Sequence, residues 1–172
     1  VQGGADIRAG NRLNFATLET ESKQNYVNDA DNYYKLHRKQ EIGNRLNIEA
    51  NALLEGRRSV EMKGVSITGN GTMRVLSDGD ILIRESRSYE DLSAGSKSVA
   101  KNLVNKTTTT RKHEHRYDLA QASEFDADKV ILQSNHGNVS VQGSNVVAEN
   151  GLWAKGKNIE IKEAENRVYS QD

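Results

Sequence analysis

Short triplets in which two apolar residues flank one other residue recur along this chain and limit the folds open to it. Leu13-Asn14-Phe15 and Val139-Ser140-Val141 are clear examples, and each has a glycine close by. In a strand, residues i and i+2 point to the same side, so the apolar doublet faces inward and the middle residue faces solvent. A strand this short buries too little to stand alone, but stacked copies bury a continuous column.

We therefore predict that six doublets are buried in stacked strands: Leu13/Phe15, Leu46/Ile48, Val65/Ile67, Ile81/Ile83, Val139/Val141 and Ile159/Ile161. The middle residues of four of them are predicted to be exposed: Asn14, Asn47, Ser140 and Glu160.

Two of the triplets belong to longer repeats. The pattern of residues 10–15 recurs at 43–48, and that of residues 138–141 recurs at 158–161. Short strands, glycine or asparagine turns and a period of about 20 residues, which the second repeat shows, are typical of one coil of a parallel β-helix. Dividing the residues outside the insertions described next by this period predicts about six coils.

Two longer polar stretches interrupt the repeat. The distance from Leu13 to Leu46 exceeds one coil, and the distance from Ile83 to Val130 exceeds two coils. We predict insertions at about residues 18–42 and 84–126 that leave the coil path as β-hairpins and rejoin it, because loop closure costs grow only slowly with length. Their tips are predicted near 28–32 and 93–105, the second one flexible or helical. Residues 1–172 are thus predicted to form one all-β solenoid domain with protruding hairpins.

Composition excludes several classes of protein. The chain has 24 basic and 24 acidic side chains, so it lacks the basic surplus of a nucleic-acid-binding protein. It has no cysteine, which excludes a disulfide framework and a thiolate zinc site. No apolar run is long enough for a membrane span. Because the chain starts at Val1 without a charged start and an apolar stretch, we expect an interior fragment of a longer protein.

Few residues suggest metal or acid chemistry. His113 and His115 would share one face of a strand and could clamp a metal, but no third ligand is assured, and exposed hairpin polarity is the favoured interpretation. Three acidic pairs could indicate calcium binding or glycoside cleavage, although Asp is also a routine turn residue and calcium-loop spacings are absent. These pairs are Asp29/Asp31, Asp78/Asp80 and Asp126/Asp128.

The remaining candidates also have an ordinary explanation. Arg57-Arg58 and Arg111-Lys112 are basic spots for which a solvated face is favoured over a weak glycan or phosphate contact. Trp153 is interpreted as packing at a coil corner, with a sugar platform as the alternative. Nucleophile elbows, phosphate loops and dinucleotide fingerprints are absent from the sequence. We therefore predict no catalytic, cofactor-binding or metal site, and no cofactor.

Three segments resemble the haemagglutinin repeats of filamentous haemagglutinin-like exoproteins: residues 5–15 followed by Glu21-Ser22-Lys23, residues 155–166, and Thr107–Thr110. The resemblance implies a right-handed parallel β-helix within a long fibre. It also implies two-partner secretion through an outer-membrane pore. The family includes host-cell adhesins linked to virulence and the sticks that carry contact-dependent growth-inhibition toxins. Neither the family's secretion domain nor a toxin is recognisable in this sequence.

The expected function is a non-enzymatic stalk segment of a secreted adhesin on the bacterial surface. Its hairpins would contact a receptor or glycan on a host or neighbouring cell, and the secretion pore would be a partner during export. Nucleic acid and a membrane span are not expected. The alternative is a β-helix polysaccharide lyase or glycoside hydrolase, which requires carboxylates and basic residues in one groove. The positions of the six paired aspartates in space distinguish the stalk from the enzyme: dispersed turns favour the stalk, and a shared groove favours the enzyme.

Overall fold

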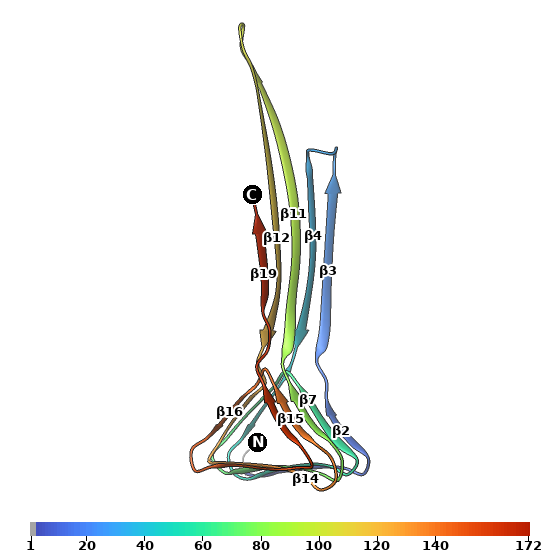
Figure 1. The fold of residues 1–172 in the computed structure, drawn as a ribbon, viewed down its shortest axis with the longest axis vertical. Helices are drawn as coiled ribbons and strands as arrows, with labels where there is room; N and C mark the ends of the chain where they lie inside the picture. The colour runs from blue at the N-terminus through green and yellow to red at the C-terminus, as the bar shows by residue number, and fades with distance from the viewer. Residues whose placement is uncertain (1–2) are drawn as a thin grey trace. The chain divides into compact units, whose positions relative to one another are not determined.

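The computed structural model describes residues 3–172, and these are 72% strand with no helix. They form two compact units (Figure 1). Unit 1 contains the described part of Val1–Leu18 together with Glu41–Ser86 and Ala120–Glu165. Unit 2 contains Glu19–Gln40, Arg87–Leu119 and Asn166–Asp172. With no helix among residues 3–172, no long apolar helix is available there to span a membrane.

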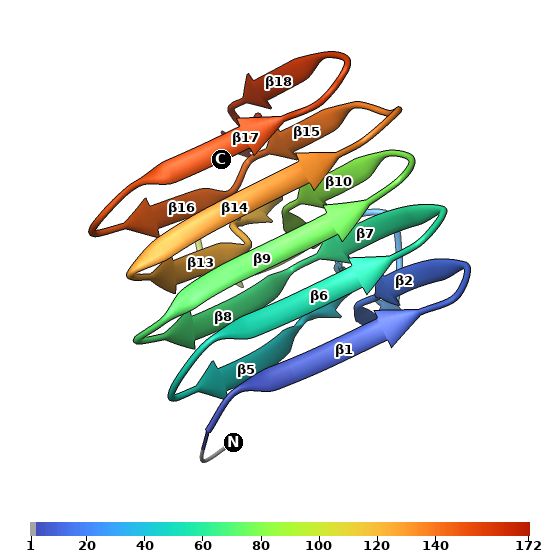
Figure 2. The same ribbon diagram turned by 90° about the horizontal axis from the view of Figure 1, so that it is seen from below.

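Unit 1 consists of three parallel sheets, which we call the first, second and third sheet (Figure 2). The first sheet has five strands in the order β1(Ala5–Ala9), β6(Ala52–Gly56), β9(Thr72–Ser77), β14(Lys129–Ser134) and β17(Leu152–Lys155). The second has five in the order β18(Ile159–Lys162), β15(Val139–Gln142), β10(Ile81–Arg84), β7(Ser59–Lys63) and β2(Arg12–Phe15). The third has four in the order β16(Asn145–Ala148), β13(Glu124–Ala127), β8(Val65–Gly69) and β5(Asn44–Ile48).

The chain visits the three sheets of unit 1 in a repeating order. It passes from β5 to β6 to β7, then from β8 to β9 to β10, and later from β13 to β14 to β15 and from β16 to β17 to β18. Leu46 lies beside Ile67, and Val139 lies beside Ile159, so partner strands come from successive passages of the chain. The predicted stacking of the triplet at 139–141 on the triplet at 159–161 is therefore confirmed. No sheet has more than five strands in the described chain, against the six coils predicted.

All three sheets contribute to one apolar core. Leu54 of the first sheet, Ile81 of the second and Phe125 of the third are among its fully buried members. Three of the predicted doublets are buried: Val65/Ile67, Ile81/Ile83 and Val139/Val141. Ile48 is also buried, and the other predicted inward residues Leu13, Phe15 and Leu46 are half-buried and pack against the core. Asn14, Asn47 and Glu160 are exposed as predicted, whereas Ser140 is half-buried. The alternation that puts i and i+2 on one side explains this core.

One predicted doublet is not buried. Ile159 is 49% exposed and Ile161 is 70% exposed. Their strand β18 pairs with β15 on one side and with no described strand on the other. A side chain in a stacked column is covered by neighbours on both sides, and β18 has only one.

The repeated hexapeptide at 10–15 and 43–48 does not mark equivalent positions. Leu13 lies on β2 in the second sheet, whereas Leu46 lies on β5 in the third. The register partner of Leu13 is Val60, and that of Leu46 is Ile67. The prediction that one coil plus an insertion separates Leu13 from Leu46 is therefore wrong, because nearly the same hexapeptide forms a strand on two different sheets.

Unit 2 is a single antiparallel sheet in the order β19(Arg167–Gln171), β12(Lys106–Gln121), β11(Ser86–Lys101), β4(Tyr33–Ile42) and β3(Leu18–Val27). β3 joins β4 through the turn at 28–32, and β11 joins β12 through the turn at 102–105. Figure 1 shows both hairpins side by side in this sheet. The expectation of a flexible or helical tip over 93–105 is wrong, because β11 remains a strand as far as Lys101.

Candidate binding surface

One face of the unit 2 sheet carries an ordered network of charged side chains. Asp91 on β11 is the register partner of His37 on β4, and Arg116 on β12 is the partner of Tyr169 on β19. Register partners lie on the same side of a sheet, and Arg116 hydrogen-bonds to Asp91 at 2.8 Å, so these side chains gather on one side. We call this side, which also carries Glu21, the charged face.

Glu21 is the centre of one half of the charged face. Its carboxylate lies 2.9 Å from the ammonium of Lys23 and 2.7 Å from Nε2 of His37. Lys39 lies farther away, at 3.8 Å. The hydrogen bond from Lys23, followed by that from His37, lowers the pKa of Glu21 to about 2. Glu21 therefore stays ionised in moderately acidic solution, and its contacts with His37 and Lys39 connect β3 to β4.

Asp91 is the centre of the other half. Arg116 donates from Nη2 at 2.8 Å and from Nε at 3.1 Å to one carboxylate oxygen of Asp91. The hydroxyl of Tyr89 donates to the same oxygen at 3.1 Å, and burial together with this bond raises the pKa of Tyr89. The His37 ring meets the Tyr89 ring edge-on with centroids 5.5 Å apart, so the two halves are in contact.

A shallow depression of about 450 Å³ lies on the charged face, lined by residues from β3, β4, β11 and β12 that include Lys23, Lys35, Ser93 and Glu114. The charges around Glu21 and Asp91 already neutralise one another, so this surface offers hydrogen bonds more than net charge. Such a surface suits recognition of a polar partner. Within residues 3–172, no group of three or more His, Cys, Asp and Glu side chains is arranged to hold a metal ion.

The two histidines singled out in the sequence lie on the opposite face of β12, at alternate positions. Nδ1 of His113 contacts a carboxylate oxygen of Asp172. The ring of His115 meets Tyr117 edge-on with centroids 5.5 Å apart. Each histidine thus has its own neighbour, and the structure gathers no further metal ligand around them within the described residues.

The paired aspartates serve different turns. Asp29 accepts backbone hydrogen bonds from Asp31 and Asn32, both at 2.8 Å, inside the β3–β4 turn of unit 2. The side-chain bond from Asn32 is the main cause of its lowered pKa. These contacts make Asp29 a turn residue, and Asp31 pairs with Lys97 at 2.6 Å.

The other two pairs belong to unit 1. Asp80 accepts from the backbone of Asn138 at 2.7 Å, at the corner between the first and second sheets. Asp78 at the same corner accepts from Asn135 at 2.8 Å. Asp128 accepts from Asn150 at the corner between the third and first sheets. Asp126 is an exposed residue of β13 itself. Within unit 1 the four carboxylates are therefore dispersed over two corners and one strand, and three of them accept hydrogen bonds from neighbouring turns.

Trp153 does not lie at a corner. It is on β17 beside Ile131 of β14, in the row that also contains Arg74, and it is 48% exposed. Leu132, which follows Ile131 on β14, is buried, so the row that contains Ile131 and Trp153 is the outward side of the first sheet. The corner-packing prediction is therefore wrong, because Trp153 lies one position out of step with the inward residues.

The basic spots are exposed, as a solvated face requires. Arg57 and Arg58 form the turn after β6, where their backbone amides donate to Ala9 and Asn11. Arg111 and Lys112 lie on β12.

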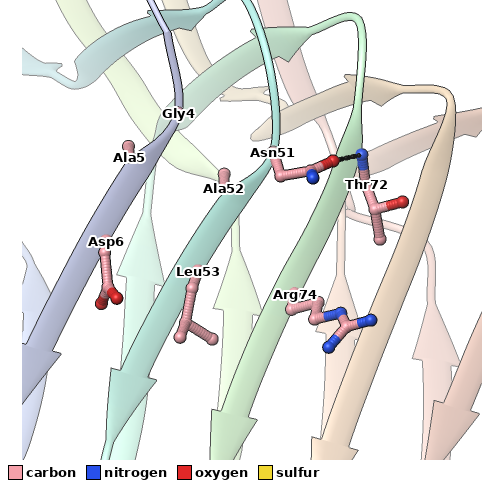
Figure 3. Close-up of a pocket in the computed structure, with 8 residues that line it drawn as sticks. All are labelled: Gly4, Ala5, Asp6, Asn51, Ala52, Leu53, Thr72 and Arg74. Atoms are coloured by element: carbon pink, nitrogen blue, oxygen red, sulfur yellow. Dashed lines mark hydrogen bonds between the residues drawn. The ribbon is translucent and has the colours of Figure 1, made fainter.

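The outward side of the first sheet also has a depression of about 480 Å³ near its first strands. Figure 3 shows Asp6, Leu53 and Arg74 on adjacent strands along it, with the Asn51 side chain accepting from the backbone of Thr72 at 2.8 Å. The carboxylate of Asp6 is held by Arg8 on its own strand at 2.8 Å. This surface is an open strip of sheet and gathers no reactive groups.

One surface was not predicted from the sequence. Residues 92–113 carry five basic side chains and no acidic one, and they include the exposed turn residues Leu103 and Val104. The lack of acidic residues over this stretch is apparent in the sequence. Only the structure shows that the stretch forms the two strands and the tip of one hairpin.

The architecture establishes the class of protein: an all-β chain in which parallel strands repeat in register and a second unit is one antiparallel sheet. Residues 104–172, which contain β12 to β19, match the haemagglutinin repeat family. This match confirms the resemblance to filamentous haemagglutinin-like exoproteins. No curated protein and no solved structure matches the chain. Haemagglutinin repeat proteins are secreted or surface-associated adhesins and are typically non-enzymatic.

Proposed function

We propose that this chain is a stalk segment of a secreted filamentous adhesin. In this proposal unit 1 is a right-handed β-helical rod and unit 2, drawn from the insertions at 18–42 and 84–126 and from the last strand, is the surface that meets a partner. The haemagglutinin repeat at 104–172 supports an adhesin-type role.

The observation that carries the proposal is the constant register of unit 1. Ile83 of β10 lies beside Met62 of β7 on one side and Val141 of β15 on the other, so each passage of the chain adds one layer to the same core. Layers that bury their apolar faces only against neighbours give a stiff element that extends by repetition. Stiffness and extension by repetition are the properties that a stalk requires, and it does not require a binding pocket.

Unit 2 is the part suited to contact. Its charged face is polar and ordered, and hydrogen-bonding side chains on a fixed sheet are suited to a receptor or glycan on a host or neighbouring cell. Repeated copies along a fibre would add avidity to weak single contacts. Export through an outer-membrane pore by two-partner secretion, surface location, a role in virulence and presentation of a growth-inhibition toxin follow from the family resemblance and stand as parts of the proposal.

A polysaccharide lyase or hydrolase is not favoured, and we propose that the chain is not an enzyme. Such an enzyme needs carboxylates and basic groups that converge on one bond. The paired aspartates of unit 1 are distributed over two corners and strand β13, and Asp80 and Asp128 each accept a hydrogen bond from a turn of the next layer.

The adhesin role is tested with beads coated with the whole chain and mixed with epithelial cells and with bacterial cells. We expect folded chain to retain beads on at least one cell type and heat-unfolded chain to retain none. A shortened variant, in which Ser98–Thr109 is replaced by Asn-Gly, should keep the thermal unfolding midpoint of unit 1 because that hairpin segment lies wholly within unit 2. Absence of retention on every cell type, or release of reducing ends from an acidic polysaccharide, would contradict the proposal.

A further inference from the structure

The distal half of the β11–β12 hairpin differs from the rest of the chain in charge. The chain is neutral overall, with 24 basic and 24 acidic side chains. Between Asp91 and Glu114, however, there is no acidic residue at all. The same stretch has five basic residues: Lys97, Lys101, Lys106, Arg111 and Lys112. Charge of one sign is therefore concentrated on one ribbon of unit 2.

The tip of this ribbon is apolar. Leu103 is 108% exposed and Val104 is 90% exposed, and they occupy the turn that joins β11 to β12. The turn is closed by a backbone hydrogen bond of 2.8 Å from Asn102 to Asn105. Apolar side chains exposed to water are unfavourable, and the cost is proportional to the exposed apolar area. Lys101 and Lys106 flank the tip on its two strands.

The rest of the sheet does not cover this ribbon. The pairing of β11 with β4 ends at Gly95, which lies opposite Tyr33, and that of β12 with β19 ends at Glu114. Lys97 is the last basic residue held by a neighbour, through its 2.6 Å pair with Asp31. Among residues 3–172, none of the ion pairs described here uses the other four basic side chains of the ribbon.

We propose that this hairpin tip docks on an anionic membrane surface, with Leu103 and Val104 entering the interfacial region and the flanking basic side chains lying at the lipid headgroups. This names a partner for the contact role proposed for unit 2 and rests on that role. Basic side chains near an anionic leaflet are attracted to it, and the attraction decays over the Debye length.

A lipid surface fits this tip better than a soluble polyanion. A sulfated polysaccharide or a nucleic acid would pair with the lysines and arginine but would leave Leu103 and Val104 in water. A membrane interface provides anionic headgroups and an apolar layer close together, which matches basic side chains placed just behind an apolar turn. The combination of the two features on one ribbon is what selects the membrane.

The test is sedimentation of the whole chain with phosphatidylcholine vesicles with and without phosphatidylserine. We expect binding only to vesicles that contain phosphatidylserine, weakened by added salt. Leu103→Ser with Val104→Ser should lower the partition coefficient by about tenfold or more, because two apolar side chains no longer leave water. Lys101→Gln with Lys106→Gln should lower it by about tenfold or more as well.

Matched controls are available within the chain. Leu18 and Val27 of β3 are also exposed, so Leu18→Ser with Val27→Ser removes the same kinds of side chain away from the tip. Lys155→Gln with Lys157→Gln removes two exposed lysines from unit 1. Both control pairs should bind vesicles as the unaltered chain does. Equal losses in the control and tip variants would overturn the proposal.

Insertion is measured directly by fluorescence. Trp153 is the only tryptophan and lies in unit 1, so Leu103→Trp in a Trp153→Phe background places the single reporter at the tip. We expect a blue shift on vesicle binding and quenching by brominated lipid. An unshifted spectrum, or binding to heparin that equals vesicle binding and ignores the Leu103 and Val104 changes, overturns membrane docking in favour of a polyanion site. If vesicles do not bind while coated beads still adhere to cells, the membrane inference fails and the adhesin proposal stands.

Discussion

Val141 on β15 and Ile161 on β18 are register partners in the second sheet, yet Val141 is only 4% exposed and Ile161 is 70% exposed. Both side chains occupy the inward column of that sheet. Val141 has β10 on its other side, whereas β18 has no further described strand beside it. The contribution of an apolar residue to the stability of this fold therefore depends on whether layers cover it from both sides.

This difference predicts that an Ile→Ala substitution lowers the free energy of unfolding by unequal amounts at two positions. Ile83 and Ile161 lie in the same column, with Val141 between them. Ile83→Ala should lower the free energy of unfolding by about 2–5 kcal/mol, because it removes buried methyl groups and leaves a cavity. Ile161→Ala should cost less than about 1 kcal/mol, because the side chain is mostly in water. Urea denaturation of both variants is the measurement, and equal midpoints would contradict the assignment of the column.

Ser123 is a buried hydroxyl with two backbone partners. Its Oγ accepts from the amide of Val65 at 2.9 Å and donates to the carbonyl of Arg84 at 2.7 Å. Ser123→Ala should cost about 1–3 kcal/mol, because the Val65 amide loses its hydroxyl partner inside unit 1. The Arg84 carbonyl keeps its hydrogen bond from the Gly64 amide at 3.0 Å. Ser140→Ala, at a half-buried position of β15, is the control and should change the unfolding free energy by less than about 0.5 kcal/mol. Thermal or urea unfolding that ranks the two variants the other way would refute this role.

Two glycines that begin the repeated hexapeptide have different surroundings. A Cβ at Gly43 would overlap the carbonyl oxygen of Gly64, whereas a Cβ at Gly10 would meet nothing within 4 Å. Gly43→Ala should destabilise unit 1 by about 1–3 kcal/mol or prevent folding, since backbone must move to admit the methyl group. Gly10→Ala should be neutral or stabilise by up to about 1 kcal/mol, because alanine reduces the freedom of the unfolded chain. Melting curves of the two single variants decide between the outcomes.

The stability of unit 2 should depend on the ionisation of Glu21. Its pKa is about 2 in the folded chain against an ordinary value of 4.5. A carboxyl with a depressed pKa contributes stability that is present above about pH 4.5 and is lost as the pH falls toward 2. Glu21→Gln should therefore speed hydrogen exchange of the β3 and β4 amides at neutral pH, and the difference from the unaltered chain should vanish near pH 2.

Glu19→Gln is the control for this pH dependence. Glu19 lies on the same strand and meets only Lys39, at 3.5 Å, among the ion pairs described here. Its replacement should leave the exchange of the β4 amides nearly unchanged at every pH. A constant difference between Glu21→Gln and the unaltered chain from neutral pH to pH 2 would show that Glu21 acts by packing and not by charge.

Much of the candidate surface could not be predicted from the sequence. His37, Asp91 and Arg116 are far apart in the chain, and nothing in their local pattern indicates that they share one face. They meet because β4, β11 and β12 are neighbours in one sheet, and that order follows from pairing between segments distant in the chain. Trp153 shows the same limit, since a shift of one position in a strand moves a side chain from the inward side to the outward side.

Local sequence pattern was sufficient to predict the all-β class, the inward doublet Ile81 and Ile83 and the partnership of Val139 with Ile159. These depend on the two-residue alternation of a strand and on turn residues, which are local properties. Long-range strand pairing, in contrast, placed Leu13 and Leu46 on different sheets and left Ile161 uncovered. It also made the acid-free stretch between Asp91 and Glu114 one ribbon with Leu103 at its tip. Those outcomes depend on which distant strands pair, and the free energy of pairing is shared by both partners and is not encoded in either segment alone.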